Sequence, residues 1–218
     1  MTKLLVVVEG DSEERFVNST LRPHLPARLR TRAIKVQTGW TPDGKPARGG
    51  GDWTKWLKQI RLLLRPGELD LAVTTMFDLY GLPPNFPGVE AAPQHKSTSS
   101  FADALEAAMK KVVADPRFVP NIIRHEFETL VLAAMPQLDE QLNPDQRERL
   151  RPLRRALAKA APEDINCGPE TSPSKRLQRL RSYGKLAHGV PAVHAAGIAR
   201  VRVSCPRFSS WISKLEKL

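Results

Sequence analysis

The hydrophobic positions in the first part of the chain alternate between short continuous runs and helical spacing. Residues 4–8 are a run of Leu and Val, typical of a strand buried on both faces of a parallel sheet. Helical spacing follows from residue 12 and is expected to end near Pro23. Further strands are predicted at residues 33–38, 69–77 and 117–123, and further helices at 53–64, 101–113 and 129–135. This alternation predicts an α/β fold with a mostly parallel sheet flanked by helices.

The pattern changes at about residue 139, after which the chain is predicted to be helical with breaks at prolines. Trp211, Ile212 and Leu215 are spaced to dock the last helix on the body of the protein. We therefore divide the chain into an α/β domain, residues 1–138, and a helical region packed on it, residues 139–218. Residues 39–51 are rich in Gly and Pro and are expected to form a loop.

Charge is distributed unevenly between these two parts. The chain has 34 Lys and Arg against 23 Asp and Glu, a formal charge of +11. Residues 173–218 hold ten basic residues and one acid, whereas residues 1–172 hold 24 basic and 22 acidic residues. A basic C-terminal segment favours a polyanionic partner, most often nucleic acid. The simpler alternative is a charge that serves solubility alone.

Composition excludes several classes of protein. Length (218 residues), 41% apolar and 26% charged residues are ordinary for a folded domain that needs no staples. Two cysteines, Cys167 and Cys205, are too few for a disulfide framework, which favours a reducing compartment. No apolar run has the length of a membrane span or the features of a signal peptide, so we expect a cytoplasmic protein with no membrane partner.

Acidic side chains follow three of the predicted strands. Glu9 follows the first, Asp78 the third, and Glu126 and Glu128 the fourth, while Glu13 can reach back from the first helix. Ligands of open α/β sheets bind at the carboxyl ends of the strands. Carboxylates gathered there repel one another unless a cation lies between them, and oxygen ligands suit Mg²⁺ or Mn²⁺. The alternative is that each acid caps a helix or turn.

The basic segment opens with hydroxyl and proline residues at 171–174. These are expected to start a helix at Pro173, followed by Lys175, Arg176, Arg179, Arg181 and Lys185. A helix N-terminus with hydroxyls and cations predicts a phosphate site, and these five cations are our candidate nucleic-acid contacts. A solvated basic helix is the alternative.

Several motifs resemble those of a known group of proteins. Residues 8–14, with Glu9 and Glu13 four apart, resemble the first motif of TOPRIM domains in the version found in OLD-family nucleases. Further motifs occur in the same order as in an uncharacterised bacterial TOPRIM-like family, and the resemblance covers nearly the whole chain. They are residues 77–83 with 85–88, residues 125–128, residues 171–177, Lys185 with His188 and Gly189, and Cys205 with Pro206, Phe208 and Trp211.

The resemblance implies a Rossmannoid TOPRIM fold with Glu9 and Glu13 as metal ligands. TOPRIM domains supply Asp-x-Asp after the third strand, but here the second acid is replaced by Tyr80, so Glu126 or Glu128 would take its place. The resemblance also implies a lysine near the scissile phosphate, Lys175 or Lys185, and a partner ATPase of the AAA or ABC type in anti-phage defence.

The sequence thus predicts a Mg²⁺-dependent nuclease with Glu9, Asp78 and one of the two lysines as catalytic residues. A second hypothesis is a binding module without catalysis that pairs with an ATPase. A third is a phosphoryl-transfer enzyme acting on a nucleotide. The three glycines at 49–51 lack the Lys-Ser/Thr of a P-loop, and no Ser/His/Asp pattern is present.

Overall fold

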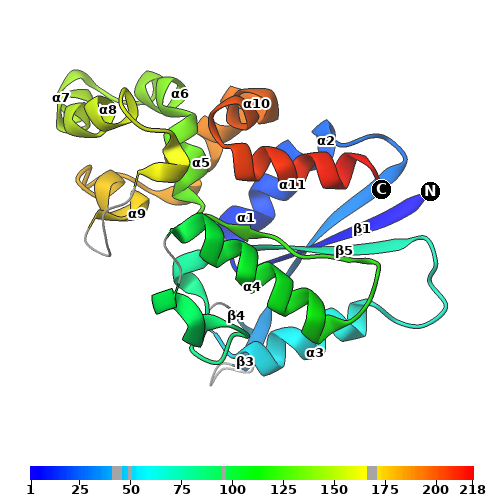
Figure 1. The fold of residues 1–218 in the computed structure, drawn as a ribbon. Helices are drawn as coiled ribbons and strands as arrows, with labels where there is room; N and C mark the ends of the chain where they lie inside the picture. The colour runs from blue at the N-terminus through cyan, green and yellow to red at the C-terminus, as the bar shows by residue number, and fades with distance from the viewer. Residues whose placement is uncertain (41–45, 49–50, 95–96, 166–170) are drawn as a thin grey trace.

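The computed structural model describes residues 1–40, 46–48, 51–94, 97–165 and 171–218. Its centre is a five-stranded sheet with the order β2-β1-β5-β6, in which β7 also pairs with β5 (Figure 1). Every pair in this sheet is parallel. The strands are β1 (Thr2–Val8), β2 (Leu29–Lys35), β5 (Leu71–Asp78), β6 (Phe118–Val119) and β7 (Ile122–Ile123). The predicted α/β fold with a mostly parallel sheet flanked by helices is confirmed.

Strand β1 is buried on both faces because its side chains enter two separate cores. Leu4, Val6 and Val8 pack under α1 (Asp11–Phe16) and the C-terminal helices, whereas Leu5 and Val7 pack on α3 (Trp53–Leu63) and α4 (Thr98–Val113). Figure 1 shows these helices as layers on opposite sides of the sheet. The continuous apolar run of this strand is explained by this double burial.

The C-terminal region, predicted at residues 139–218, is helical, as expected. Its side chains share the first core with β1, since Leu177, Val193 and Trp211 belong to the same buried cluster as Leu4. In the described parts of the chain, no helix is both long and apolar enough to cross a membrane. The helices are α5 (Glu128–Ala133), α6 (Met135–Glu140), α7 (Pro144–Arg149), α8 (Arg151–Leu157), α9 (Pro173–Leu177), α10 (Val190–Ser204) and α11 (Pro206–Glu216), with short turns η4 (Pro162–Asp164) and η6 (Lys185–Gly189).

Some boundaries differ from the sequence prediction. The first helix continues as a π-helical turn, η1 (Val17–Leu21), and ends one residue beyond Pro23 in α2 (Arg22–His24). The strand predicted at 117–123 is split into β6 and β7 because Pro120, between them, has no N–H for the ladder. Part of the predicted loop at 39–51 forms an antiparallel pair, β3 (Gln37–Trp40) with β4 (Pro46–Arg48); the rest includes residues outside the described ranges.

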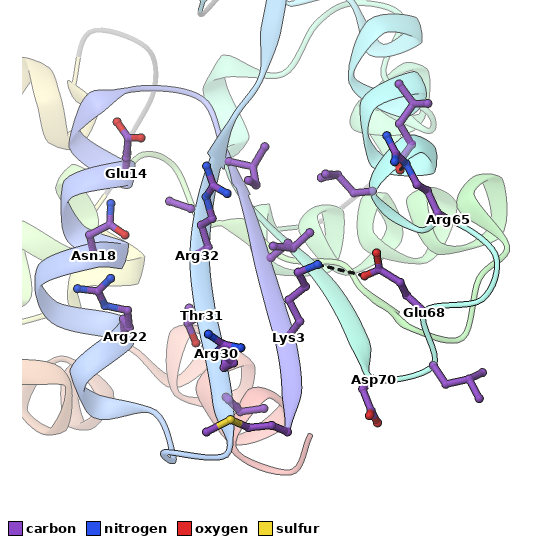
Figure 2. A pocket seen from close by; sticks show the side chains of 18 of the residues that line it. Lys3, Glu14, Asn18, Arg22, Arg30, Thr31, Arg32, Arg65, Glu68 and Asp70 are labelled. Atoms are coloured by element: carbon purple, nitrogen blue, oxygen red, sulfur yellow. Dashed lines mark hydrogen bonds and ion pairs between the residues drawn. The ribbon is translucent and has the colours of Figure 1, made fainter.

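Strand β2 forms an open edge of the sheet. It pairs with β1 on one side and with no other strand among the described residues. Leu29, Thr31 and Ala33 are buried, whereas Arg30 and Arg32 are exposed. Figure 2 shows this edge between the helix that carries Asn18 and Arg22 and the loop that carries Glu68 and Asp70.

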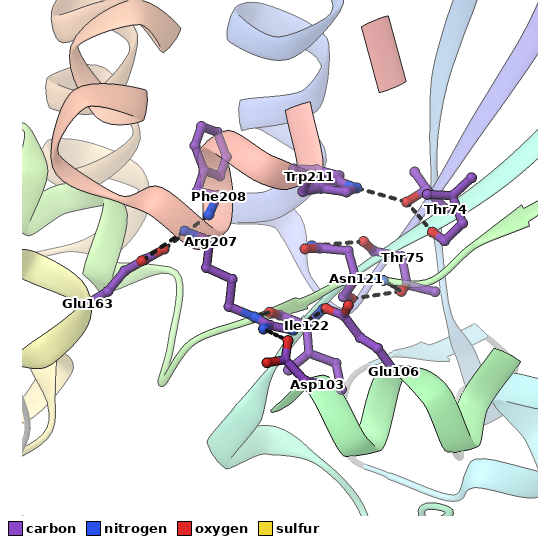
Figure 3. Close-up of polar contacts among 11 residues, drawn as sticks. Thr74, Thr75, Asp103, Glu106, Asn121, Ile122, Glu163, Arg207, Phe208 and Trp211 are labelled. Carbon is purple, nitrogen blue, oxygen red and sulfur yellow. Dashed lines mark hydrogen bonds and ion pairs between the residues drawn. The ribbon is translucent and has the colours of Figure 1, made fainter. Parts of the chain in front are cut away.

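Helix α11 is fastened to the sheet by polar contacts that are buried or nearly so (Figure 3). The indole N–H of Trp211 donates to Thr74 Oγ1 over 2.9 Å. The buried carboxylate of Glu163 accepts the backbone N–H groups of Arg207 and Phe208, each over 3.0 Å, at the start of the helix. The Arg207 guanidinium also contacts Glu106 of α4. These contacts tie α11 to both layers.

We expect Glu163→Ala to lower the free energy of unfolding by about 2 kcal/mol, because one buried and one partly buried N–H group lose their acceptor. Urea denaturation followed by circular dichroism measures this change. The control is Glu148→Ala, which removes an exposed i,i+3 pair with Arg151 and should cost at most about 0.5 kcal/mol. Equal losses in both variants would contradict a capping role for Glu163.

Candidate functional site

Glu9 and Asp78 lie side by side at the carboxyl ends of the two central strands. β1 and β5 are adjacent and parallel, with Val8 opposite Met76 in their register. Glu9 Oε1 accepts the backbone N–H of Asp78 over 2.7 Å. The structure therefore places these two acids at the same end of the sheet, as expected for neighbouring parallel strands.

Two glycines leave room for the acids. A Cβ atom on Gly81 would lie 3.0 Å from Glu9 Oε2 and 3.6 Å from Asp78 Cβ. A Cβ atom on Gly10 would lie 3.0 Å from Glu13 Oε2. Side chains at these positions would press on the carboxylates, so both glycines serve the close packing of the site.

The ammonium group of Lys185 lies among the carboxylates. Its Nζ is 3.1 Å from Glu128 Oε2, 3.5 Å from Glu13 Oε1 and 3.8 Å from Asp78 Oδ2. The Phe127 ring lies under the same group, with its centroid 5.6 Å from Nζ. One lysine from the C-terminal region thus binds acids from α1, β5 and α5.

Burial makes this cluster electrostatically costly. Desolvation raises the pKa of Glu9 to about 7, helped by the charge of Glu13 and opposed by the hydrogen bond from Asp78. Desolvation also raises the pKa values of Asp78 and Glu128, and Lys185 opposes both shifts. The carboxylates in turn outweigh the desolvation of Lys185 and raise the pKa of its ammonium group. The group is therefore a set of acids stabilised by one cation.

The donor set suits a divalent cation. Glu9, Glu13, Asp78 and Glu128 offer only oxygen atoms, which Mg²⁺ and Mn²⁺ prefer. Asp78 Oδ1 is buried and has no hydrogen-bond partner among the described residues. No three acids, His or Cys in the described ranges are arranged as a ready-made metal site. The acids fit a metal by their chemistry, while their present arrangement is centred on the ammonium of Lys185.

Other predicted site residues lie outside this cluster. Glu126 points to α9, where its Oε2 accepts the backbone N–H of Ser174 over 2.9 Å. Lys175, also on α9, is exposed, as are Arg179 and Arg181, and Arg176 Nε donates to the Thr171 carbonyl. The predicted phosphate site at the start of this helix differs from the structure: α9 has only five residues, and Glu126 occupies one of its first N–H groups.

His125 has a structural role beside the site. Its Nε2 lies 2.8 Å from the Glu163 carbonyl oxygen and must donate to it, so Nδ1 accepts from the Tyr80 hydroxyl, 3.0 Å away. Burial lowers its pKa, which keeps the ring neutral. Its φ of 70° is a left-handed conformation that is uncommon for a residue other than Gly. The Tyr80 hydroxyl is thus bound to a histidine.

Tyr183 was not predicted from the sequence. Its hydroxyl is buried without a hydrogen-bond partner among the described residues, and its pKa is raised by burial and by Glu128 and Glu126. A Cβ atom on Gly189 would lie 2.6 Å from this hydroxyl, so a larger residue there would require the Tyr183 side chain to move. The one feature of the sequence that points to Tyr183 as a site residue is its position two residues before Lys185.

Solved structures of two OLD proteins are similar to this chain. In structure it is similar to the C-terminal region of the Burkholderia pseudomallei OLD protein, with a TM-score of 0.47, 15% identity, and coverage of 100% of this chain and 98% of that chain. It is also similar to the C-terminal region of the Xanthomonas campestris pv. campestris OLD protein, with a TM-score of 0.43, 14% identity and 98% of each chain covered. No curated protein sequence matches it.

A family model is matched over almost the full length. The match covers residues 8–216, which include every acid and lysine of the site. The chain belongs to the DUF4276 family, described as a domain of unknown function.

Proposed function

We propose that the protein is a nuclease that hydrolyses phosphodiester bonds of nucleic acid with a divalent metal ion. The observation that carries this proposal is the convergence of four acids and one lysine at the carboxyl end of the central strands. Surplus buried negative charge is the environment that a divalent cation needs. The motifs that resemble TOPRIM domains fall on these same residues.

In this proposal Glu9, Glu13, Asp78 and Glu128 hold Mg²⁺ or Mn²⁺. When bound, the ion supplies Lewis-acid chemistry, polarising the phosphate and lowering the pKa of a water molecule. Asp78 contributes an oxygen, Oδ1, that has no other hydrogen-bond partner among the described residues. Glu126 is not a metal ligand in this proposal, because its carboxylate accepts a backbone N–H group in the first turn of α9.

Lys185, not Lys175, is the lysine of the mechanism. Its ammonium is within 3.8 Å of three of the proposed ligands, whereas Lys175 is exposed on α9. The acids keep Lys185 charged, since their charges outweigh the effect of burial and hold the pKa of its ammonium group above the usual value. Placed beside the phosphate, this charge stabilises the negative charge that develops in the transition state.

The exposed cations next to the site bind the substrate backbone. Lys175 lies on α9, which is joined to the site through Glu126 and Ser174, and Arg179 and Arg181 follow it. Contacts of this kind position nucleic acid without reading its sequence. We further propose a cytoplasmic effector of prokaryotic defence that works with a partner ATPase of the AAA or ABC type, as the sequence resemblance implies.

A second candidate function is a nucleic-acid or partner-binding subunit without catalysis. It is favoured by two observations: Lys185 already neutralises part of the acid cluster, and no ready-made metal site exists among the described residues. The experiments below distinguish the two functions.

The first prediction concerns catalysis. We expect Glu9→Gln to lower Mg²⁺- or Mn²⁺-dependent cleavage by at least ~100-fold, because losing a ligand costs at least as much as losing a group that supports one. Cleavage of plasmid DNA, RNA and a free nucleotide is measured side by side. Glu126→Gln is the matched control, since its amide oxygen can still accept from Ser174, and we expect it to retain activity.

Full activity in Glu9→Gln would exclude this mechanism. Native protein that binds nucleic acid but never cleaves it, even with an ATPase encoded beside it, would favour the binding subunit. Cleavage of the free nucleotide alone would favour phosphoryl transfer.

The second prediction concerns metal binding without an activity readout. Lys185→Met removes the ammonium while keeping a side chain of similar length, so the acids lose a cation. We expect a lower Tm in EDTA, and a rise in Tm on adding Mn²⁺ at least about 3 °C larger than in the native protein. Lys175→Met is the control and should behave as native. If Mn²⁺ shifts neither protein, the acid cluster is not a metal site.

The third prediction concerns pH. The folded protein keeps the Glu9 proton up to about pH 7, whereas the carboxyl group ordinarily loses it near 4.5. Protonation therefore stabilises the fold: the contribution is full below pH 4.5 and is lost as pH rises through about 7. In EDTA, the free energy of unfolding should fall over this range, and less so in Glu9→Gln. Equal slopes for the two proteins would contradict the raised pKa.

A further inference from the structure

A large cavity, about 1440 Å³, lies along the outer edge of β2. Its walls are the helix that carries Asn18 and Arg22 on one side, and the end of α3 with the loop to β5 on the other (Figure 2). Met1, Lys3 and Asp70 line it, so it reaches the starts of β1 and β5. The acid cluster lies at the opposite ends of the same strands. This edge is therefore a surface separate from the proposed active site.

The backbone of β2 has free hydrogen-bonding groups along this edge. The N–H of Val36 donates to the Val8 carbonyl of β1, so the even-numbered residues of β2 direct their backbone groups to β1. The N–H and C=O groups of Thr31 and Ala33 then face outward, and no other strand in the described residues pairs with them. The Thr31 hydroxyl is also buried without a hydrogen-bond partner in the described parts of the chain. The edge is thus ready to accept another strand.

The charge along the cavity is positive where β2 is open. Arg22, Arg30 and Arg32 line it, and none of them has a carboxylate partner among the described residues. Three acids also line the cavity: Glu14 and Glu68 are already paired, with Lys35 and Lys3, and Asp70 lies just before β5. Arginines without a carboxylate partner, on β2 and on the helix beside it, favour a ligand with several carboxylates.

Apolar side chains complete the surface. Met1, Leu62 and Leu69 line the cavity and are 77%, 52% and 91% exposed. Apolar groups of this size gain free energy when a partner covers them. A ligand that alternates acidic and apolar residues would satisfy both features, because side chains on a strand alternate between its faces.

We propose that the outer edge of β2 binds an extended acidic segment of a partner protein, which adds to the sheet as a further strand. A second copy of this chain fits poorly, because an antiparallel β2–β2 pair would set Arg30 of one copy against Arg32 of the other. A nucleic-acid backbone also fits poorly, because phosphates have no donors for the outward carbonyl groups of Thr31 and Ala33. The proposal does not depend on the nuclease reaction.

The test uses the full chain and a labelled peptide of alternating Glu and Val. Arg30→Glu/Arg32→Glu should weaken peptide binding at least about 10-fold in fluorescence anisotropy, since close charge pairs become repulsive. In the native protein, the peptide should slow hydrogen exchange of the Thr31 and Ala33 amides, which a surface contact through side chains would not do. Arg155→Glu/Lys159→Glu, the same charge change on exposed residues at the end of α8, is the control and should bind as native.

Several outcomes would overturn the proposal. One is equal binding of a peptide in which Lys replaces Glu, and another is unchanged exchange at Thr31 and Ala33 when the peptide is bound. Preferential binding of a single-stranded oligonucleotide that is lost in Arg30→Glu/Arg32→Glu would reassign the edge to nucleic acid. A native dimer in sedimentation equilibrium that the same variant separates would reassign it to a second copy. Nuclease activity, present or absent, changes none of these readouts.

Discussion

Acids buried at one end of a sheet require a cation among them. Strands β1 and β5 are parallel neighbours, so Glu9, which follows β1, and Asp78, the last residue of β5, lie together at one end of the sheet. Lys185, which comes from a distant part of the sequence, offsets part of their mutual repulsion and desolvation. The position of the C-terminal region on the sheet is therefore linked to the charge of the site, and the two cannot be understood separately.

The central strands and their acids could be predicted because the signals are local. A run of Leu and Val buried on both faces marks β1, and an acid directly after such a run falls at the carboxyl end of the sheet whatever the rest of the chain does. The helices with strong periodicity, α3 and α4, were predicted within a few residues for the same reason. The predicted boundaries were wrong where a proline splits a strand, as between β6 and β7, or where a short hairpin lies in a predicted loop, as with β3 and β4.

The choice between neighbouring candidates could not be made from the sequence. Glu126 and Glu128 are two residues apart, yet they contact different partners, Ser174 and Lys185. The backbone turns between β7 and α5, where His125 is left-handed and is held by contacts with Tyr80 and Glu163, both far away in the sequence. Lys175 and Lys185 were equivalent for a similar reason, since only the packing of η6 against α1 and α5 brings one of them to the acids.

The contact between Glu13 and Lys185 joins residues that are 172 positions apart. During synthesis Glu13 is made 172 residues before Lys185, so a growing chain carries the repulsion of the acids before it has their counter-charge. Closing so long a loop also has an unfavourable entropy, so we expect this contact to form late in folding. A growing chain that has not reached residue 185 therefore has the acids without the lysine, and the site is assembled only after η6 has been made and has packed against α1 and α5.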